Sequence, residues 1–324
     1  MTGGFAFEWC LHALHVTAQG SVAALLLMPA ARFWESRRPA LASALLAVAF
    51  LKFLLPPMLP APSGIFSFFA AVPAGGVRVT GVVLAVAAVL HAAGIVFVLF
   101  RLAREHAAIA GIWRRASESA AAPLYPLFEA RCREAGTDRA PELRVSREIG
   151  VPFAWGVFRP AILVPEALCA ALSEDTLSLL LAHEAAHARR RDPARNVFES
   201  TVAALWWFNP VFGGLIRRRR ALREERCDAD VVKLLPGRAR DYAQALVEAA
   251  SVAFPVRTPG VASPATTTAE ELARRLRRIA RPERVRRSAG LEAAACLAAA
   301  ALLIPGVRPG AAPRSRPSGL VRPR

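Results

Sequence analysis

Long apolar runs constrain the fold of this chain more than any other feature of its sequence. Three runs lie in the N-terminal third and a fourth near the C-terminus, at about residues 7–31, 40–59, 80–100 and 288–307. A stretch of roughly 20 apolar residues is long enough to cross a bilayer as a helix. We therefore predict an α-helical membrane protein with about four transmembrane helices. Residues 1–103 would form a three-helix region, and residues 287–324 a fourth helix with a short basic tail.

The distribution of arginine predicts how these helices are oriented. Arg32, Arg37 and Arg38 follow the first run, and Arg101 follows the third. The loop at residues 62–76, between the second and third runs, carries no charge. Because short loops rich in positive charge stay on the cytoplasmic side, we expect the N-terminus outside and the chain after the third run in the cytoplasm.

The net charge of +17 would also be compatible with nucleic-acid binding. The arginines, however, cluster beside apolar runs and around the motif helices, and we find no known nucleic-acid-binding motif. We expect the lipid bilayer as a partner and no direct contact with nucleic acid. Residues 104–286, between the third and fourth runs, are predicted to form an inserted cytoplasmic α+β domain.

A His-Glu-x-x-His motif is the strongest signal for chemistry, in a chain with six histidines. It lies in a segment with helical periodicity, with Ser173 as a candidate N-cap and Pro193 just beyond its end. His183 and His187 are about one helical turn apart, so both imidazoles point from one face and can bind one Zn²⁺. Glu184 would then be the general base for the attacking water. The motif predicts a zinc metallopeptidase.

A catalytic zinc site normally has three protein ligands, so the two histidines require a third. Glu224 and Asp228 are four residues apart on a second predicted helix and share one face. We predict that Glu224 is the third ligand and that Asp228 accepts a hydrogen bond from a ligand histidine. Glu225 is the main competitor for the ligand role. Alternatively, these acids only pair with Arg223, Arg226 and their neighbours on a solvated helix face.

Four segments together resemble the BlaR/MecR-type family of integral membrane zinc metallopeptidases, the antirepressor transducers of beta-lactam resistance and their relatives. They are PFAWGVFRPAILVP (152–165), LLAHEAAHARRRDP (180–193), WWFNP (206–210) and EERCDADVV (224–232). The resemblance implies a gluzincin-like site in which His183, His187 and Glu224 bind zinc and Glu184 is the base. The pattern around Glu224 also occurs in HtpX-type and CAAX-prenyl membrane proteases, whereas the other segments favour the BlaR/MecR type.

The resemblance also implies a location and a function. It implies a protease of the bacterial inner membrane whose active site faces the cytoplasm and whose substrate is a protein, such as a transcriptional repressor or the chain itself. An HtpX-like quality-control protease and a non-catalytic membrane transducer are the alternatives. The best-known members carry a penicillin-binding sensor domain after the last span, whereas residues 308–324 alone follow it here. We therefore expect the stimulus to enter through the spans, the outer loop or a separate sensor partner.

Two further elements are candidates for contact with substrate. Residues 152–165 have the composition of short strands, with breaks at Gly156 and Pro160. In zinc peptidases of this general architecture, the exposed edge of a strand just before the motif helix can pair with an extended substrate. The resemblance implies this role for the strand at residues 157–164. The residues predicted to contact substrate on this strand are Val157, Phe158, Ala161 and Ile162. Alternatively, the segment is an ordinary core strand. Tyr242 is a candidate hydrogen-bond donor to the oxyanion, with a packing role as the alternative.

The uncharged segment at residues 200–216 is short for a membrane span. A single crossing here would put Glu224 on the opposite side of the bilayer from the motif histidines. We therefore predict a hairpin, either dipping into the membrane or packing in the core, with breaks at Asn209-Pro210 and Gly213-Gly214. His91 lies in the middle of the third span, where a hydrogen bond between helices is the simplest explanation for it.

Overall fold

The structure is a computed structural model that describes residues 2–35, 37–54, 81–137, 139–253 and 269–280, with residues 294 and 297–299. The chain divides into two compact units. One contains Met1–Glu35, Ala40–Leu90 and Arg287–Arg324, and the other contains Ser36–Pro39 and His91–Arg286. The second unit contains the His-Glu-x-x-His motif, so it is the one that bears on chemistry.

The first unit contains two packed helices, α1 (Thr2–Trp34) and α2 (Pro39–Leu54). Gly20 of α1 lies against the ring of Phe53 of α2, and a Cβ at this glycine would come within 2.7 Å of that ring. A side chain here would therefore push the two helices apart.

The described residues contain two helices that are long and apolar enough to cross a membrane. They are Ala13–Trp34 within α1 and Gly81–Arg115, which is α3. The second predicted run forms α2, which has 16 described residues and is shorter than a full span. Most of the fourth predicted run lies outside the described residues, so the total of four spans stays a prediction.

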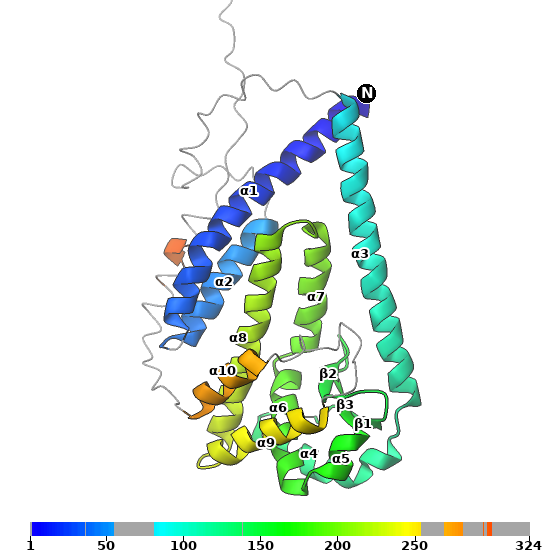
Figure 1. The fold of residues 1–324 in the computed structure, drawn as a ribbon, viewed down its shortest axis with the longest axis vertical. Coiled ribbons are helices and arrows are strands. Elements are labelled where there is room, and N and C mark those ends of the chain that lie inside the picture. The colour runs from blue at the N-terminus through cyan, green and yellow to red at the C-terminus, as the bar shows by residue number, and fades with distance from the viewer. Residues whose placement is uncertain are drawn as a thin grey trace, which may run out of the picture. The chain divides into compact units, whose positions relative to one another are not determined.

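The second unit contains a three-stranded sheet (Figure 1). After α3, the 3₁₀ helix η2 (Ser119–Leu124) and helix α4 (Tyr125–Glu134) lead into β1 (Glu142–Ser146), β2 (Phe153–Trp155) and β3 (Ala161–Pro165). The strand order is β1-β3-β2. Strand β3 pairs parallel with β1 and antiparallel with β2.

Both faces of the central strand β3 are covered by apolar side chains. Ile162 and Val164 belong to a core with Leu181 of the motif helix, whereas Leu163 belongs to a second core with Ile109 of α3. This alternation is the period of two that a strand imposes on its side chains. Because α3 packs against the sheet near its C-terminal end, it joins the apolar span directly to the domain that carries the motif.

The prediction of an exposed edge strand at residues 157–164 is wrong. The chain turns at Gly156, which has a φ of 98°, and a Cβ there would collide with the carbonyl oxygen of Arg159. Val157 and Phe158 therefore lie in a turn, and the strand begins only at Ala161. Both edges of β3 are already paired, because β1 and β2 flank it. Ala161 and Ile162 are core residues.

This correction gives a stability prediction for Ile162, which is fully buried. Replacing it with alanine should lower the free energy of unfolding by about 2–5 kcal/mol, because the lost side chain leaves a cavity in the core. Thermal unfolding of the full chain in detergent would measure the effect. The matched control is Phe158→Ala, which removes a side chain that is 97% exposed and should change the stability by about 0.5 kcal/mol or less. Equal destabilisation by the two changes would contradict the assignment.

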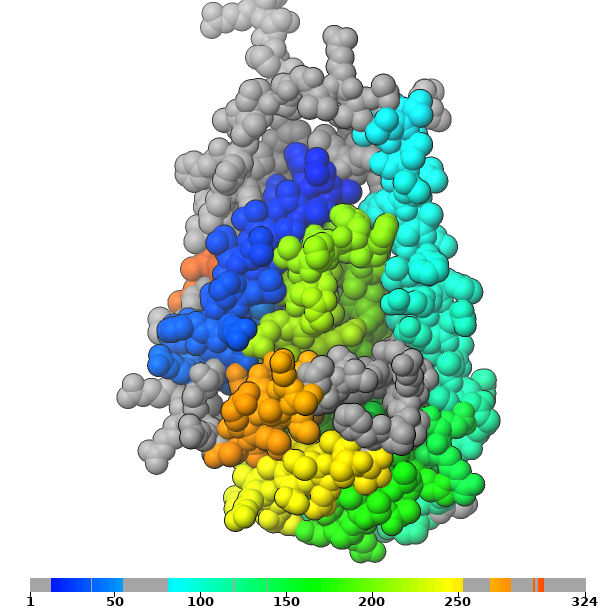
Figure 2. Space-filling view, viewed as in Figure 1, coloured from blue at the N-terminus to red at the C-terminus, as the bar shows by residue number. Residues whose placement is uncertain are grey.

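Among the described residues, six helices follow the sheet, and the motif lies on the second of them. They are α5 (Glu166–Ala171), α6 (Glu174–Arg189), α7 (Asp192–Leu205), α8 (Pro210–Leu234), α9 (Ala239–Ala253) and α10 (Ala269–Ala280). Helix α6 lies inside the unit, in contact with α4, α7, α8, α9 and the sheet. The predicted N-cap is confirmed, since the Ser173 hydroxyl accepts a hydrogen bond from the backbone N–H of Thr176. Figure 2 shows α9 in yellow and α10 in orange, side by side on the surface.

The predicted hairpin at residues 200–216 is confirmed as a pair of helices. Helix α7 ends at Leu205, and the side chain of Asn209 caps α8 by accepting hydrogen bonds from the N–H groups of Val211 and Phe212. The predicted break at Gly213-Gly214 is wrong, since both glycines lie inside α8. Buried Phe212 and Leu215 hold this turn of the helix against its neighbours, which outweighs the low helix propensity of glycine.

Candidate metal centre

Three side chains that could bind a metal ion, His183, His187 and Glu224, converge between α6 and α8 and are called the ligand cluster below. The Nε2 atoms of His183 and His187 are 3.1 Å apart. The carboxylate of Glu224 lies 3.4 Å from Nε2 of His183 and 3.5 Å from Nε2 of His187. A tetrahedral ion with bonds of about 2.0–2.1 Å separates its ligand atoms by about 3.3 Å, so the spacing of the two nitrogens and the carboxylate is close to what one zinc ion requires. The structure thus brings together the three residues that the sequence predicted as ligands.

The outer nitrogen of His187 is held by a carboxylate that the sequence analysis missed. Nδ1 of His187 lies 2.9 Å from Oδ2 of Asp192, the first residue of α7. With the proton on Nδ1, the imidazole donates to this carboxylate and turns its Nε2 lone pair toward the ligand cluster. The signal in the sequence was an acid just before Pro193, five residues after the histidine.

The outer nitrogen of His183 has two oxygen neighbours. Nδ1 lies 2.8 Å from the hydroxyl of Tyr242 on α9 and 3.3 Å from Oδ1 of Asp228 on α8. The tyrosine in turn donates to Asp228 at 2.6 Å. Asp228 thus lies next to the outer nitrogen of His183, as predicted, and the hydroxyl of Tyr242 contacts both Asp228 and His183.

The position of Tyr242 does not support the prediction that it donates to an oxyanion. Its side chain is 1% exposed, and its hydroxyl proton is already given to Asp228. It lies against Nδ1 of His183, on the side of the ring turned away from the ligand cluster. In this arrangement Tyr242 contacts His183 and Asp228 and does not face the Nε2 side of the histidines. The sequence could not reveal these contacts, because helical periodicity predicts which face of a helix is buried and not which residue a buried tyrosine contacts.

Arg275 on α10 closes this network. Its guanidinium donates to Oδ1 of Asp228 at 2.7 Å and to Oδ2 at 2.8 Å, and a third nitrogen lies 3.6 Å from the carboxylate of Glu224. Burial opposes the ionisation of Asp228, but Arg275 and His183 outweigh it and hold the pKa of this carboxyl well below its usual range. Sequence reasoning missed Arg275 because it lies 47 residues after its partner.

Glu225, the competitor for the ligand role, points into a different ion-pair network. Its two carboxylate oxygens lie 3.1 Å from Arg274 and 2.6 Å from Arg278, both on α10. The two adjacent glutamates of α8 thus face different groups: Glu224 lies at the histidines, whereas Glu225 pairs with Arg274 and Arg278 of α10. The alternative, in which these acids only pair on a solvated face, does not fit, because Glu225 and Asp228 are both buried.

Glu184 is buried beside the cluster, with 7% of its surface exposed. Among the described residues, no hydrogen-bond partner reaches its Oε2. Burial raises the pKa of Glu184, while the two motif histidines act in the opposite direction. A buried carboxylate with a free oxygen is unusual unless that oxygen has a ligand to meet. This orphaned acceptor and the two-nitrogen, one-oxygen donor set both fit a catalytic zinc site.

A second group of residues that could bind a metal consists of His187, Asp192 and Cys227, and it shares His187 with the first group. Cys227 lies 3.4 Å from Nδ1 of His187 and 3.6 Å from Asp192. Burial raises the pKa of the Cys227 thiol, which disfavours the thiolate that binds zinc. Nδ1 of His187 is also engaged by Asp192. The second group therefore supports the orientation of the histidine, and the ligand cluster lies on its Nε2 side.

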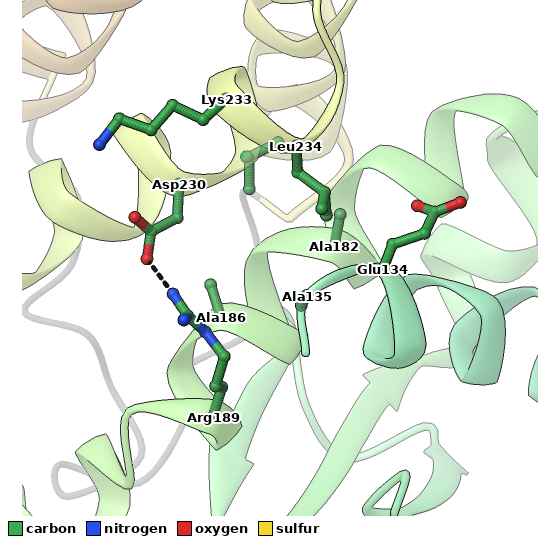
Figure 3. A pocket seen from close by; sticks show the side chains of 9 residues that line it. Glu134, Ala135, Ala182, Ala186, Arg189, Asp230, Lys233 and Leu234 are labelled. Carbon is green, nitrogen blue, oxygen red and sulfur yellow. Dashed lines mark hydrogen bonds and ion pairs between the residues drawn. The ribbon is translucent and has the colours of Figure 1, made fainter. Parts of the chain in front are cut away.

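The domain also has a cavity of about 270 Å³ between α4, α6 and α8 (Figure 3). Ala182, Ala186 and Arg189 of α6 line it, and Arg189 forms an ion pair of 2.7 Å with Asp230. Neither histidine of the ligand cluster lines this cavity. It is separate from the metal centre.

Comparison with known proteins places this chain in a family. The family profile described as BlaR1 peptidase M56 matches residues 71–279, more than half of the chain. The chain belongs to the M56 family. The BlaR/MecR-type resemblance is thereby confirmed, and the match covers all the ligand-cluster residues as well as Arg275. M56 proteins are metallopeptidases; with two long apolar helices and a mostly helical fold, this member is a membrane-associated one.

A curated relative shares part of this region. The chain is 33% identical over 84 residues to a protein named "Regulatory protein BlaR1" from Bacillus licheniformis. The match covers 26% of this chain and 14% of the length of that protein. It supports the family assignment of the matched part.

The contact between His187 and Asp192 gives a prediction for zinc binding. Asp192→Asn should weaken zinc binding about 10–100-fold, because an amide accepts the imidazole proton less well and no longer fixes its tautomer. Titration of the purified, metal-stripped protein with zinc against a competing chelator would measure the affinity. Asp230→Asn is the control, since Asp230 pairs with Arg189 and Arg190 outside the cluster. Unchanged affinity in Asp192→Asn would contradict an orienting role.

Proposed function

We propose that this protein is a membrane zinc metalloendopeptidase that acts in signal transduction. The observation that carries the proposal is the convergence of His183, His187 and Glu224, whose donor atoms lie 3.1–3.5 Å apart on two helices. Membership of the M56 family supports a peptidase, and the donor set supports zinc as its metal.

The side chains around the cluster have distinct roles in the proposed reaction. Zinc would polarise the scissile carbonyl and lower the pKa of the attacking water. Glu184 takes the proton from that water and passes it to the leaving amine, for which its orphaned Oε2 is available. Asp192 and Tyr242 hold the outer nitrogens of the two histidines, so that both Nε2 atoms face the cluster.

The sheet offers a place for an extended substrate at β2. Strand β2 is an edge strand, paired with β3 on one side, and it contacts the motif helix α6. The outer edge of β1, by contrast, is bridged to Ser117. A substrate backbone can add to a free strand edge through main-chain hydrogen bonds. We therefore assign substrate pairing to Phe153–Trp155 in place of the strand that the sequence suggested.

The substrate we propose is a protein in or at the membrane, such as a transcriptional repressor or the chain itself. The charge pattern supports an active site at the cytoplasmic face of a bacterial inner membrane, because Arg101 and Arg104 follow the apolar part of α3 on the side of the domain. The name of the Bacillus relative, a regulatory protein, is in keeping with a signalling role.

A comparison of new protein N-termini in cells tests the proposal. Cells with the wild type and cells with Glu184→Gln would be compared under several envelope stresses, with bound zinc quantified in both proteins. Fragments that appear only with the wild type, at equal zinc, would establish proteolysis and identify the substrate. Equal zinc with no difference in fragments would favour a non-catalytic transducer, and absent zinc in both proteins would reject the metal site. Cleavage of many misfolded membrane proteins would favour a quality-control protease.

A further inference from the structure

We propose that the tip of the α7–α8 hairpin, residues 205–210, inserts into the hydrocarbon of the bilayer beside α3. Three apolar side chains at this tip face outward: Leu205 is 43% exposed, Trp207 48% and Phe208 45%. In a soluble domain these side chains would form an apolar patch in water, which soluble proteins avoid unless the patch has a partner.

Helix α3 meets the hairpin tip within its own apolar span. Nε2 of His91 lies 3.0 Å from the carbonyl oxygen of Leu205, and the imidazole ring packs edge-on against Phe208 at 5.4 Å. Gly94, one turn further along α3, lies directly against the ring of Trp207 and leaves no room for a Cβ. The tip therefore lies at the depth of His91, which is ten residues beyond the start of α3 at Gly81.

Several polar backbone groups at and next to the tip have partners, which lowers the cost of placing them in hydrocarbon. The carbonyl oxygen of Leu205, at the C-terminal end of α7, lies within hydrogen-bond distance of His91. The first N–H groups of α8 donate to the side chain of Asn209, which is buried. His91 thus has a structural role, because this histidine in the span satisfies the helix end that the hairpin brings to it.

The three helices change from apolar to basic at a similar distance from the tip. The arginines concerned are Arg101 and Arg104 on α3, Arg195 on α7, and Arg217 and Arg218 on α8. With a helix rise of about 1.5 Å per residue, Arg101 is about 15 Å from His91, Arg195 about 15 Å from Leu205, and Arg217 about 10 Å from Pro210. Half of a hydrocarbon core is about 15 Å thick. These arginines, the arginine belt, thus lie at the height of the lipid headgroups.

A charged residue between the tip and the arginine belt is shielded inside the hairpin. Glu199 of α7 is 2% exposed and pairs with Arg219 at 2.8 Å and Arg223 at 2.7 Å, both from α8. The outward residue at this level is Phe198, which is 54% exposed. An acid turned inward and an aromatic turned outward suit a lipid environment.

Lipid is favoured over a second protein as the occupant because the apolar surface continues along α3. Val89, Leu90, Val96 and Phe97 are each 63–67% exposed, and none of the apolar window of α3 is buried within the chain. This exposed surface belongs to a helix long enough to cross a membrane. The exposed side chains of the hairpin tip extend this apolar surface at the level of His91.

Insertion also determines the height of the metal centre. Glu224 is 14 residues from Pro210 along α8, or about 21 Å at the helix rise, and is thus about 10 Å beyond Arg217. The ligand cluster is therefore held just outside the headgroups. For the proposed peptidase, this height selects substrate segments close to the membrane surface. That consequence rests on the proposed function, whereas insertion of the tip does not.

Cysteine accessibility in open membrane fragments, where both aqueous faces are exposed, tests the insertion. Phe208→Cys and Phe158→Cys make the same change at two exposed phenylalanines, one at the tip and one in the turn before β3. With a charged maleimide, and after subtraction of the wild-type signal, Phe158→Cys should be labelled at least about tenfold faster than Phe208→Cys. Detergent should bring the two rates close together. Equal labelling in the intact membrane would overturn the proposal.

Tryptophan quenching identifies the occupant of the tip. The full chain would be reconstituted in phosphatidylcholine vesicles with brominated acyl chains, and the contribution of Trp207 obtained by subtracting the Trp207→Phe spectrum. Trp113→Phe is the control, since Trp113 packs with Trp155 at the sheet. We expect Trp207 to lose about half of its emission or more and Trp113 to lose little. A protected cysteine at 208 without quenching of Trp207 would show that protein covers the tip, and would overturn the lipid assignment.

Discussion

Replacing Glu184 with glutamine is expected to lower kcat for peptide-bond hydrolysis by about 10²–10⁴-fold, because the amide cannot accept the proton of the attacking water. Glutamine has nearly the same shape as glutamate, and Glu184 is not one of the three clustered donors. Bound zinc should therefore stay equal to that of the wild type. The measurement is the rate of cleavage of the substrate identified from the new N-termini, with zinc determined on the same samples.

The control for Glu184→Gln is Glu174→Gln, which makes the same change in the exposed first turn of the same helix. It should retain the wild-type rate. If the Glu184→Gln protein cleaves at the wild-type rate, Glu184 is not the general base of the reaction. A loss of zinc along with the loss of activity would instead assign it to the metal site.

Glu224→Gln is expected to weaken zinc binding by about 100-fold or more. Zinc sites bind with about 10–16 kcal/mol shared among their ligands, so one charged ligand contributes roughly 3 kcal/mol. The amide also leaves the two histidines without the negative charge that lies 3.4–3.5 Å from them. Zinc titration of metal-stripped protein would measure the change, and activity should fall in parallel at limiting zinc.

Glu225→Gln is the matched control for Glu224→Gln, because it changes the adjacent glutamate of the same helix. Its partners are Arg274 and Arg278, so the change should loosen α10 and leave the zinc affinity within about tenfold of the wild type. The reverse result, with zinc lost in Glu225→Gln and kept in Glu224→Gln, would show that the competitor is the ligand.

Arg275 links the metal centre to α10. The helix is held on α8 by three arginines, with Arg274 and Arg278 on Glu225 and Arg275 on Asp228. Burying such charges is favourable only while each has its partner, so removing one partner is costly. The orientation of His183, through Tyr242 and Asp228, therefore depends on a helix that lies beyond residues 254–268. The dependence of His183 on α10 follows from these tertiary contacts, and no local sequence pattern predicts it.

Residues close in sequence were enough to predict the centre of the candidate site. A spacing of four on a helix puts His183 above His187, and the same spacing puts Glu224 and Asp228 on one face, whatever the rest of the fold does. The Ser173 cap and the break at Asn209-Pro210 are local in the same sense, because each satisfies or ends a helix within a few residues.

Tertiary structure decided everything that depends on which segments meet. Residues 157–164 read as one strand, but the turn at Gly156 and the pairing of β3 on both sides put Ile162 in the core. Tyr242 became a partner of His183 only because α9 packs on α6, and Arg275 reached Asp228 across 47 residues. Periodicity and capping depend on neighbouring residues, whereas these contacts depend on the docking of elements distant in the chain. The sequence by itself therefore determined the ligand helices and their family, and the fold determined what holds and surrounds them.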